Sequence, residues 1–153
     1  MSSETFIIAG ITLLGGIFLF ILQQIIEKSF FKPLQKQKDT IEDIATLLIQ
    51  YSSLYTNPTN YGGEHFDNLI RKKYSDASNK TRELASLLKV RSDNIPLYNF
   101  WVKIYNIIPR KNIGNAFSKL IGLSNSYGNV GHGIENSDLA DEIRNLLKIP
   151  SVN

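Results

Sequence analysis

The chain has 153 residues, a formal net charge of +3 and 42% hydrophobic residues, but no cysteine. This length accommodates one small domain and one additional segment, and without cysteine no disulfide bond can hold the fold together. The small positive charge does not indicate a nucleic-acid partner, since basic flanks at a membrane give a chain the same sign.

Residues 5–27 are expected to form one transmembrane helix, which follows a short external N-terminus of residues 1–4. Within it, Thr5–Ile26 carries no charge and contains fourteen Ile, Leu or Phe residues. A helix of this length extends about 33 Å, enough to cross a hydrocarbon core of about 30 Å. Two alternatives are a cleaved signal peptide, although the start MSSET has no basic residue, and a helix buried in a protein core.

Residues 28–38 form the predicted basic juxtamembrane hinge. Its lysines are Lys28, Lys32, Lys36 and Lys38. Because basic flanks stay in the cytoplasm, the lipid bilayer is the expected partner of a single-pass protein with its N-terminus outside and residues 28–153 inside. Abundant Ile and Asn favour a bacterial source, and hence the inner membrane. Pro33 disfavours helix at Lys32 and predicts a kink or a stop there.

Ala9, Thr12 and Gly16 recur at helical spacing and place small side chains on one face of the predicted span. Small residues let helix backbones approach closely in lipid. This face is therefore a candidate contact for a homo-oligomer, although small residues are also common in spans that do not associate.

Residues 39–153 are expected to form a cytosolic all-α bundle, because no segment alternates like a strand and Pro and Gly divide the chain into helical lengths. The clearest helix covers Asp39–Tyr55, with a cap at Asp39 or Thr40. Its apolar seam consists of Ile41, Ile44, Leu48, Tyr51 and Tyr55. The seam suits either the core of a small bundle or an oligomer contact through Ile41, Ile44 and Leu48.

A loop at Thr56–Glu64 precedes a helix that is expected from near His65 to Arg91. Two groups of basic residues follow in this part of the chain. They are Arg71, Lys72 and Lys73, and further on Arg110 and Lys111. Charges along a helix are usually solvated, and the alternative is that these residues bind an anion.

Three further helices are expected after the break at Ile95-Pro96. The first covers Leu97–Ile108, with Trp101 in the core or, alternatively, at the membrane interface. Its predicted inward face is Leu97, Phe100, Trp101, Ile104 and Ile108. The second helix begins at Asn112 and the third near Ser137, joined by a glycine-rich connector.

No motif of a catalytic, metal or nucleotide site stands out. The connector Ser124–Gly133 lacks the Lys-Ser/Thr pair of a P-loop. His65 and His132 have no acidic or Cys neighbours at metal-site spacing, and no Ser lies in a nucleophile elbow. We therefore expect no enzymatic activity and no cofactor.

Several marks lie within residues 81–126. They are Arg82-x-Leu84-Ala85-Ser86-x-Leu88, the breaks Ile95-Pro96 and Ile108-Pro109, and Ile121-Gly122-Leu123-Ser124-Asn125-Ser126. With these marks the region resembles a family of small, uncharacterised single-pass bacterial membrane proteins that have a helical cytosolic domain. The resemblance implies this architecture but no activity. By themselves, the prolines set helix lengths and Gly122 permits close packing.

Three functions compete. The favoured one is a membrane-anchored, non-enzymatic interaction module that binds an unknown cytosolic protein or itself. The second is a nucleotide-gated membrane effector, similar in architecture to bacterial antiphage defence proteins, whose anionic nucleotide would bind Arg71–Lys73 and Arg110–Lys111. The third is a membrane-tethered hydrolase.

Overall fold

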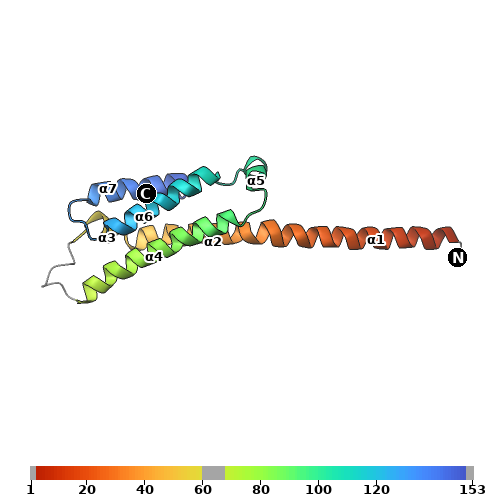
Figure 1. Cartoon of the computed structure of the whole chain (residues 1–153), viewed down its shortest axis with the longest axis horizontal. Coiled ribbons are helices and arrows are strands. Elements are labelled where there is room, and N and C mark those ends of the chain that lie inside the picture. Colours follow the sequence, from red (N-terminus) through yellow and green to blue (C-terminus); the bar gives the residue numbers. More distant parts are fainter. Residues whose placement is uncertain (1–2, 60–67, 151–153) are drawn as a thin grey trace.

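The structure is a computed structural model that describes residues 3–59 and 68–150. These residues form helices and no strand, which confirms the all-α fold class. A long helical rod leads into a helical bundle (Figure 1). The rod consists of α1 (Ser3–Ile26), the π-helical η1 (Glu27–Phe31) and α2 (Lys32–Gln50), which follow one another without a break.

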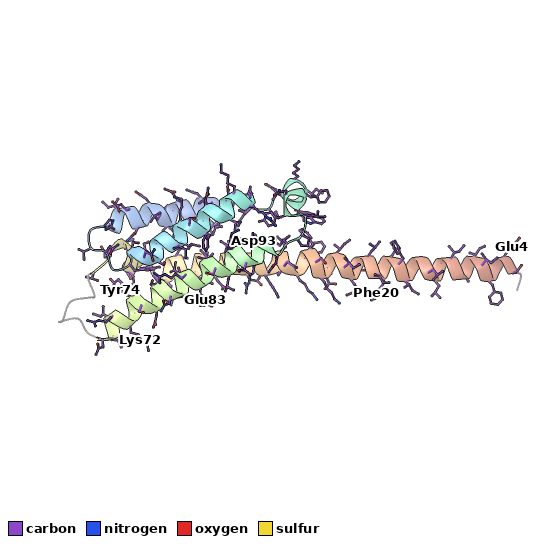
Figure 2. The ribbon with its side chains drawn as sticks, viewed as in Figure 1. Glu4, Phe20, Lys72, Tyr74, Glu83 and Asp93 are labelled. Atoms are coloured by element: carbon purple, nitrogen blue, oxygen red, sulfur yellow. The ribbon has the colours of Figure 1, made fainter. Side chains whose placement is uncertain are left out.

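The side chains drawn on α1 project on all sides of the helix (Figure 2). All fourteen of its Ile, Leu and Phe side chains are exposed. α1 is long and apolar enough to span a membrane, and none of its most apolar stretch is buried. The alternative that it is a core helix is therefore wrong. The first two residues of the predicted external N-terminus lie outside the described residues.

The predicted stop at Pro33 is wrong, because the helix widens into one π-helical turn just before it and continues as α2. The Lys32 N–H donates to the carbonyl of Glu27, five residues earlier, and Lys32 has helical angles of φ −64° and ψ −47°. Proline lacks an N–H, and its ring crowds the carbonyl of the preceding turn. A wider turn just before Pro33 absorbs this conflict. The predicted hinge of residues 28–38 is therefore a helical part of the rod.

The bundle consists of helices that pack on one another in successive pairs. α2 packs on α4 (Asn68–Asp93), α4 on α6 (Arg110–Ser126), and α6 on α7 (Gly133–Leu147), while the short α3 (Ser52–Thr56) contacts α7. Their apolar faces meet in one core. Its fully buried members include Ile44, Leu48, Leu88, Ile113, Leu120, Leu123 and Ile143.

The first bundle helix differs from its predicted bounds at both ends. Asp39 and Thr40 do not cap it, because the helix has already begun, and the Thr40 hydroxyl donates to the Lys36 carbonyl at 2.8 Å. Tyr51 leaves helical geometry (φ −103°, ψ 14°) and separates α2 from α3. The predicted helix start near His65 and the second half of the loop Thr56–Glu64 lie outside the described residues.

α5 (Tyr98–Tyr105) buries only part of the predicted face, since Trp101 is partly buried and Ile108, which lies beyond the end of α5, is buried. Leu97 is 75% exposed, Phe100 52% and Ile104 55%, whereas Tyr98 is only 2% exposed. Left-handed residues flank the helix, with φ of 50° at Leu97 and 48° at Asn106. These two turns rotate α5 so that Tyr98 points inward. A second, smaller core results, in which Phe30, Leu34, Ile95 and Tyr98 are buried and Trp101, Val102 and Ile107 are partly buried.

Two glycines of the C-terminal part differ in their importance. α7 begins at Gly133 rather than near Ser137, and a methyl group on Gly133 would overlap the carbonyl oxygen of Thr56. This close approach requires glycine. The expectation that Gly122 permits close packing is wrong, since a methyl group there would meet no atom within 4 Å.

Candidate functional site

The two basic groups that would bind one anion in the effector alternative lie at opposite ends of α4. Arg71–Lys73 are in its first turns, and Figure 2 labels Lys72 and Asp93 at its two ends. At about 1.5 Å per residue, Arg71 and Asp93 are roughly 33 Å apart. Arg110 lies beyond Asp93, because its Nη2 is 3.4 Å from the carbonyl oxygen of Ile95. One small ligand therefore cannot contact both groups.

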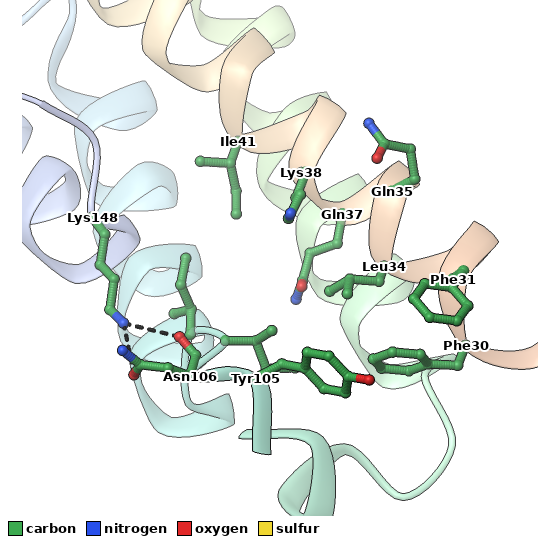
Figure 3. A pocket seen from close by; sticks show the side chains of 12 residues that line it. Phe30, Phe31, Leu34, Gln35, Gln37, Lys38, Ile41, Tyr105, Asn106 and Lys148 are labelled. Atoms are coloured by element: carbon green, nitrogen blue, oxygen red, sulfur yellow. Dashed lines mark hydrogen bonds between the residues drawn. The ribbon is translucent and has the colours of Figure 1, made fainter. Parts of the chain in front are cut away.

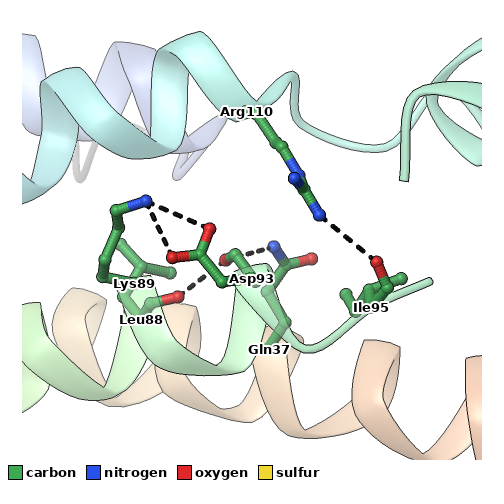
Figure 4. A network of polar contacts seen from close by, with 7 residues as sticks. Gln37, Leu88, Lys89, Asp93, Ile95 and Arg110 are labelled. Carbon is green, nitrogen blue, oxygen red and sulfur yellow. Dashed lines mark hydrogen bonds and ion pairs between the residues drawn. The ribbon is translucent and has the colours of Figure 1, made fainter. Parts of the chain in front are cut away.

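Arg110 has a structural contact of its own (Figure 4). Besides the Ile95 carbonyl, its guanidinium carbon lies 5.1 Å from the centre of the Tyr98 ring. This cation–π contact and the hydrogen bond tie the start of α6 to the connection between α4 and α5. Lys111, the other predicted member of this group, is exposed.

The two sets of predicted helix-association residues have different outcomes. Ile44 and Leu48 are fully buried in the core of the chain and Ile41 is partly buried there. Ile44 and Leu48 are therefore unavailable for an oligomer contact, which favours the other prediction for this seam, the core of a small bundle. Ala9, Thr12 and Gly16 are exposed, and they line a shallow groove on α1. The remaining lining residues of the groove are Leu13, Ile17 and Phe20.

A basic groove of about 630 Å³ lies between α2 and α4, at the end of the bundle nearest α1. Its cations are Lys28, Lys32, Lys36 and Arg91. Lys32 pairs with Glu27 at 3.5 Å, and Arg91 donates to the Lys36 carbonyl at 2.9 Å and to the Thr40 hydroxyl at 2.6 Å. No carboxylate lines the groove, so its field attracts anions.

The lysines of this basic groove could be predicted from the sequence, but its arginine could not. Lys28, Lys32 and Lys36 are four residues apart, which places them on one helix face. Arg91 is more than fifty residues away, and only the packing of α4 on α2 brings it to the same groove.

A second cavity of about 420 Å³ lies between α2 and the connection from α5 to α6 (Figure 3). Its apolar lining residues are Phe30, Phe31, Leu34, Ile41, Ile107 and Ile108. At its polar side, Lys148 Nζ donates to the backbone and side-chain oxygens of Asn106 at 3.2 and 3.3 Å. The cavity suits an apolar group with one polar end.

Five aromatic rings from η1 and α5 touch one another at this same end of the bundle. We call them the aromatic collar; its members are Phe30, Phe31, Phe100, Trp101 and Tyr105. The Trp101 ring stacks on Phe30 with centroids 3.9 Å apart, and the centroid of Phe100 lies 5.1 Å from that of Trp101. Offset and edge contacts of this kind stabilise ring pairs.

A buried polar network holds the rod, α4 and α5 together. Gln37 Nε2 donates to Ser92 Oγ at 2.7 Å and to Tyr98 Oη at 2.8 Å. The Tyr98 hydroxyl donates in turn to the Ile108 carbonyl at 2.7 Å. Burial raises the pKa of Tyr98, and the Gln37 hydrogen bond and Arg110 oppose this increase in part. Figure 4 shows Gln37 reaching from the rod towards α4.

Only one of the two histidines lies within the described residues. His132 is exposed and pairs with the neighbouring Glu135, and His65 lies outside the described residues. Within residues 3–59 and 68–150, no group of three or more His, Asp or Glu side chains could hold a metal ion.

No family model, curated protein or solved structure matches the chain. The resemblance of residues 81–126 to a family of single-pass bacterial membrane proteins therefore stays a prediction.

Proposed function

We propose that this chain is a membrane-anchored, non-enzymatic interaction module of the bacterial inner membrane, and that it self-associates through one face of α1. The observation that carries the proposal is the groove on α1. Ala9, Thr12 and Gly16 form its floor between bulkier neighbours, and nothing in the chain covers it.

The first step of the argument is that α1 needs apolar surroundings. It exposes fourteen large apolar side chains, and leaving such a side chain in water costs about 1.5–3 kcal/mol. The sum, roughly 20–40 kcal/mol, is an upper bound on the free energy that α1 gains by leaving water for apolar surroundings. A bilayer core removes this cost along the whole length of α1.

The second step concerns orientation. Lys28, Lys32 and Lys36 follow α1 on the side of the bundle, whereas the first turn of α1 carries Glu4 and no lysine or arginine. Positive flanks remain in the cytoplasm, so the bundle is cytoplasmic and the N-terminus is outside.

The third step is the contact itself. The Thr12 hydroxyl donates to the Ile8 carbonyl at 2.9 Å, so it needs no water or partner within lipid. Small side chains at Ala9, Thr12 and Gly16 let a second helix approach, and van der Waals packing then drives association. Because the rod continues into the bundle core, associated spans also bring their bundles together and reinforce weak bundle contacts.

The test compares Gly16→Ile with Gly15→Ile by crosslinking the full chain in native membranes. Both variants add the same side chain to α1, and neither site has an atom of the single chain within 4 Å of the new Cβ. Only Gly16 lies in the groove. We expect Gly16→Ile to reduce the crosslinked dimer by about tenfold, equivalent to about 1.4 kcal/mol, and Gly15→Ile to crosslink like the wild type. Equal crosslinking of both variants, or a wild type that is monomeric at natural abundance, would refute self-association.

The nucleotide-gated effector has less support. It required Arg71–Lys73 and Arg110–Lys111 to act on one ligand, and α4 separates these groups by most of its length.

A further inference from the structure

We propose that the aromatic collar and the exposed face of α5 form a second membrane contact, in which α5 lies in the interfacial layer of the leaflet next to the bundle. This inference rests on the membrane anchoring proposed above, but not on self-association.

The position of the collar along the rod supports this contact. Phe30 is four residues beyond Ile26, the last residue of α1, or about 6 Å along a helix. The interfacial layer on each side of a bilayer is about 5–7 Å thick. Trp101 stacks directly on Phe30, and α5 is the part of the bundle that lies nearest α1 (Figure 1). The collar is therefore at the depth of the lipid headgroups.

The chemistry of the collar suits this depth. Trp and Tyr concentrate at membrane–water interfaces, because their rings are apolar and their N–H or O–H groups remain hydrated. Trp101 is partly exposed, and Phe31, Phe100 and Tyr105 are each about half exposed. Lys103 on α5 is exposed as well and suits the phosphates of an anionic leaflet.

The conformation of Leu97 is a further, independent observation. Leu97 adopts a left-handed conformation (φ 50°), which is disfavoured for every residue with a Cβ. Its carbonyl accepts from the N–H groups of Phe100 and Trp101, but Leu97 is 75% exposed, so packing of its side chain within the chain contributes little to offset the strain. Insertion of this side chain into lipid would offset it, together with the exposed Phe100 and Ile104 on the same helix.

Trp101 is the only tryptophan of the chain and therefore reports on the collar without labelling. The full chain is reconstituted into phosphatidylcholine vesicles that contain some phosphatidylglycerol, and recovery is checked by flotation. The lipids carry bromine either near the headgroup end or near the methyl end of the acyl chain. We expect stronger quenching of Trp101 fluorescence by the headgroup-end bromine, as for an interfacial residue.

Variants separate lipid contact from folding. Phe100→Ser with Ile104→Ser removes two exposed side chains and should reduce quenching by roughly half. Leu97→Gly relieves the left-handed strain, so it should raise the melting temperature in detergent yet weaken quenching. The matched control is Ile134→Ser, since Ile134 is 80% exposed but belongs to α7, at the end of the bundle away from α1. This control should leave quenching unchanged.

The outcomes distinguish the inference from the proposed function. A chain that floats with vesicles but shows no quenching by either lipid overturns the collar contact and leaves the anchor intact. If neither brominated lipid quenches Trp101 and aqueous iodide does not quench it either, a second copy of the chain covers the collar instead of lipid. A chain that does not float overturns the membrane anchor and the collar contact together.

Discussion

Replacing Tyr98 by Phe tests how α5 is fixed to the rest of the molecule. The substitution keeps the buried ring and removes only its hydroxyl. That hydroxyl accepts from Gln37 at 2.8 Å and donates to the Ile108 carbonyl at 2.7 Å. Both partners are buried, and every buried side-chain nitrogen and oxygen of the described residues has a hydrogen-bond partner. The variant therefore leaves two polar groups without this partner.

The expected cost follows from those two groups. A buried donor or acceptor that loses its partner costs about 1–3 kcal/mol. Gln37 keeps its bond to Ser92 at 2.7 Å, so its loss is at the lower end of that range. The loss of both hydrogen bonds should lower the free energy of unfolding by about 2–4 kcal/mol. For a bundle of this size, this lowers the melting temperature by about 10 °C or more.

Thermal unfolding of the full chain in detergent micelles, followed by far-UV circular dichroism and by Trp101 fluorescence, measures this effect. The matched control is Tyr105→Phe. Tyr105 belongs to the same helix, is 52% exposed and is a member of the collar, so loss of its hydroxyl should change the free energy of unfolding by less than about 0.5 kcal/mol. If Tyr98→Phe proves no more destabilising than Tyr105→Phe, the polar network does not hold α5 in place.

Three further predictions concern the bundle and its placement. Gly133→Ala should destabilise the bundle by about 2 kcal/mol, since the new methyl group overlaps Thr56. Gly122→Ala should stabilise the bundle by about 0.5–1 kcal/mol, because alanine suits a helix interior better than glycine does and meets no atom there. Melting curves of the two variants test both predictions. Burial raises the pKa of Tyr127 from 10.0 to about 12, so stability should be intact below pH 10 and fall by roughly 2–3 kcal/mol between pH 10 and 12, and Tyr127→Phe should remove this part of the alkaline loss. A reporter fused to Asn153 should be active only if it functions in the cytoplasm; activity of a periplasmic reporter would reverse the proposed orientation.

The sequence alone predicts α1 and the all-α fold class well. Both depend on local composition: an uncharged apolar run long enough to span a bilayer, and helical spacing in every later segment. The inward positions of α2 were also visible, because Ile44 and Leu48 fall on its apolar face. Periodicity identifies such a face but cannot decide whether the same chain or a second copy covers it.

Long-range geometry explains the errors. The face of α5 depends on left-handed turns at Leu97 and Asn106, and Asn is a common residue in such turns whereas Leu is not. The sequence predicted a break at Pro33 because proline is an obvious helix breaker. The π-helical turn that accommodates the proline has no comparably clear sequence pattern. Arg91 reaches the basic groove only through the contact between α2 and α4.

The continuity of the rod links the proposals to each other. Among the described side chains of the rod, the first buried one is Phe30, only four residues after α1 ends. One helix therefore changes from apolar on all sides to apolar on one face within about one turn. In the proposed orientation this leaves no spacer between bilayer and bundle, and the end with α5 and the basic groove has to rest on the leaflet. A cytosolic protein partner can then reach only the flanks of the bundle and its far end, where α4 and α7 begin.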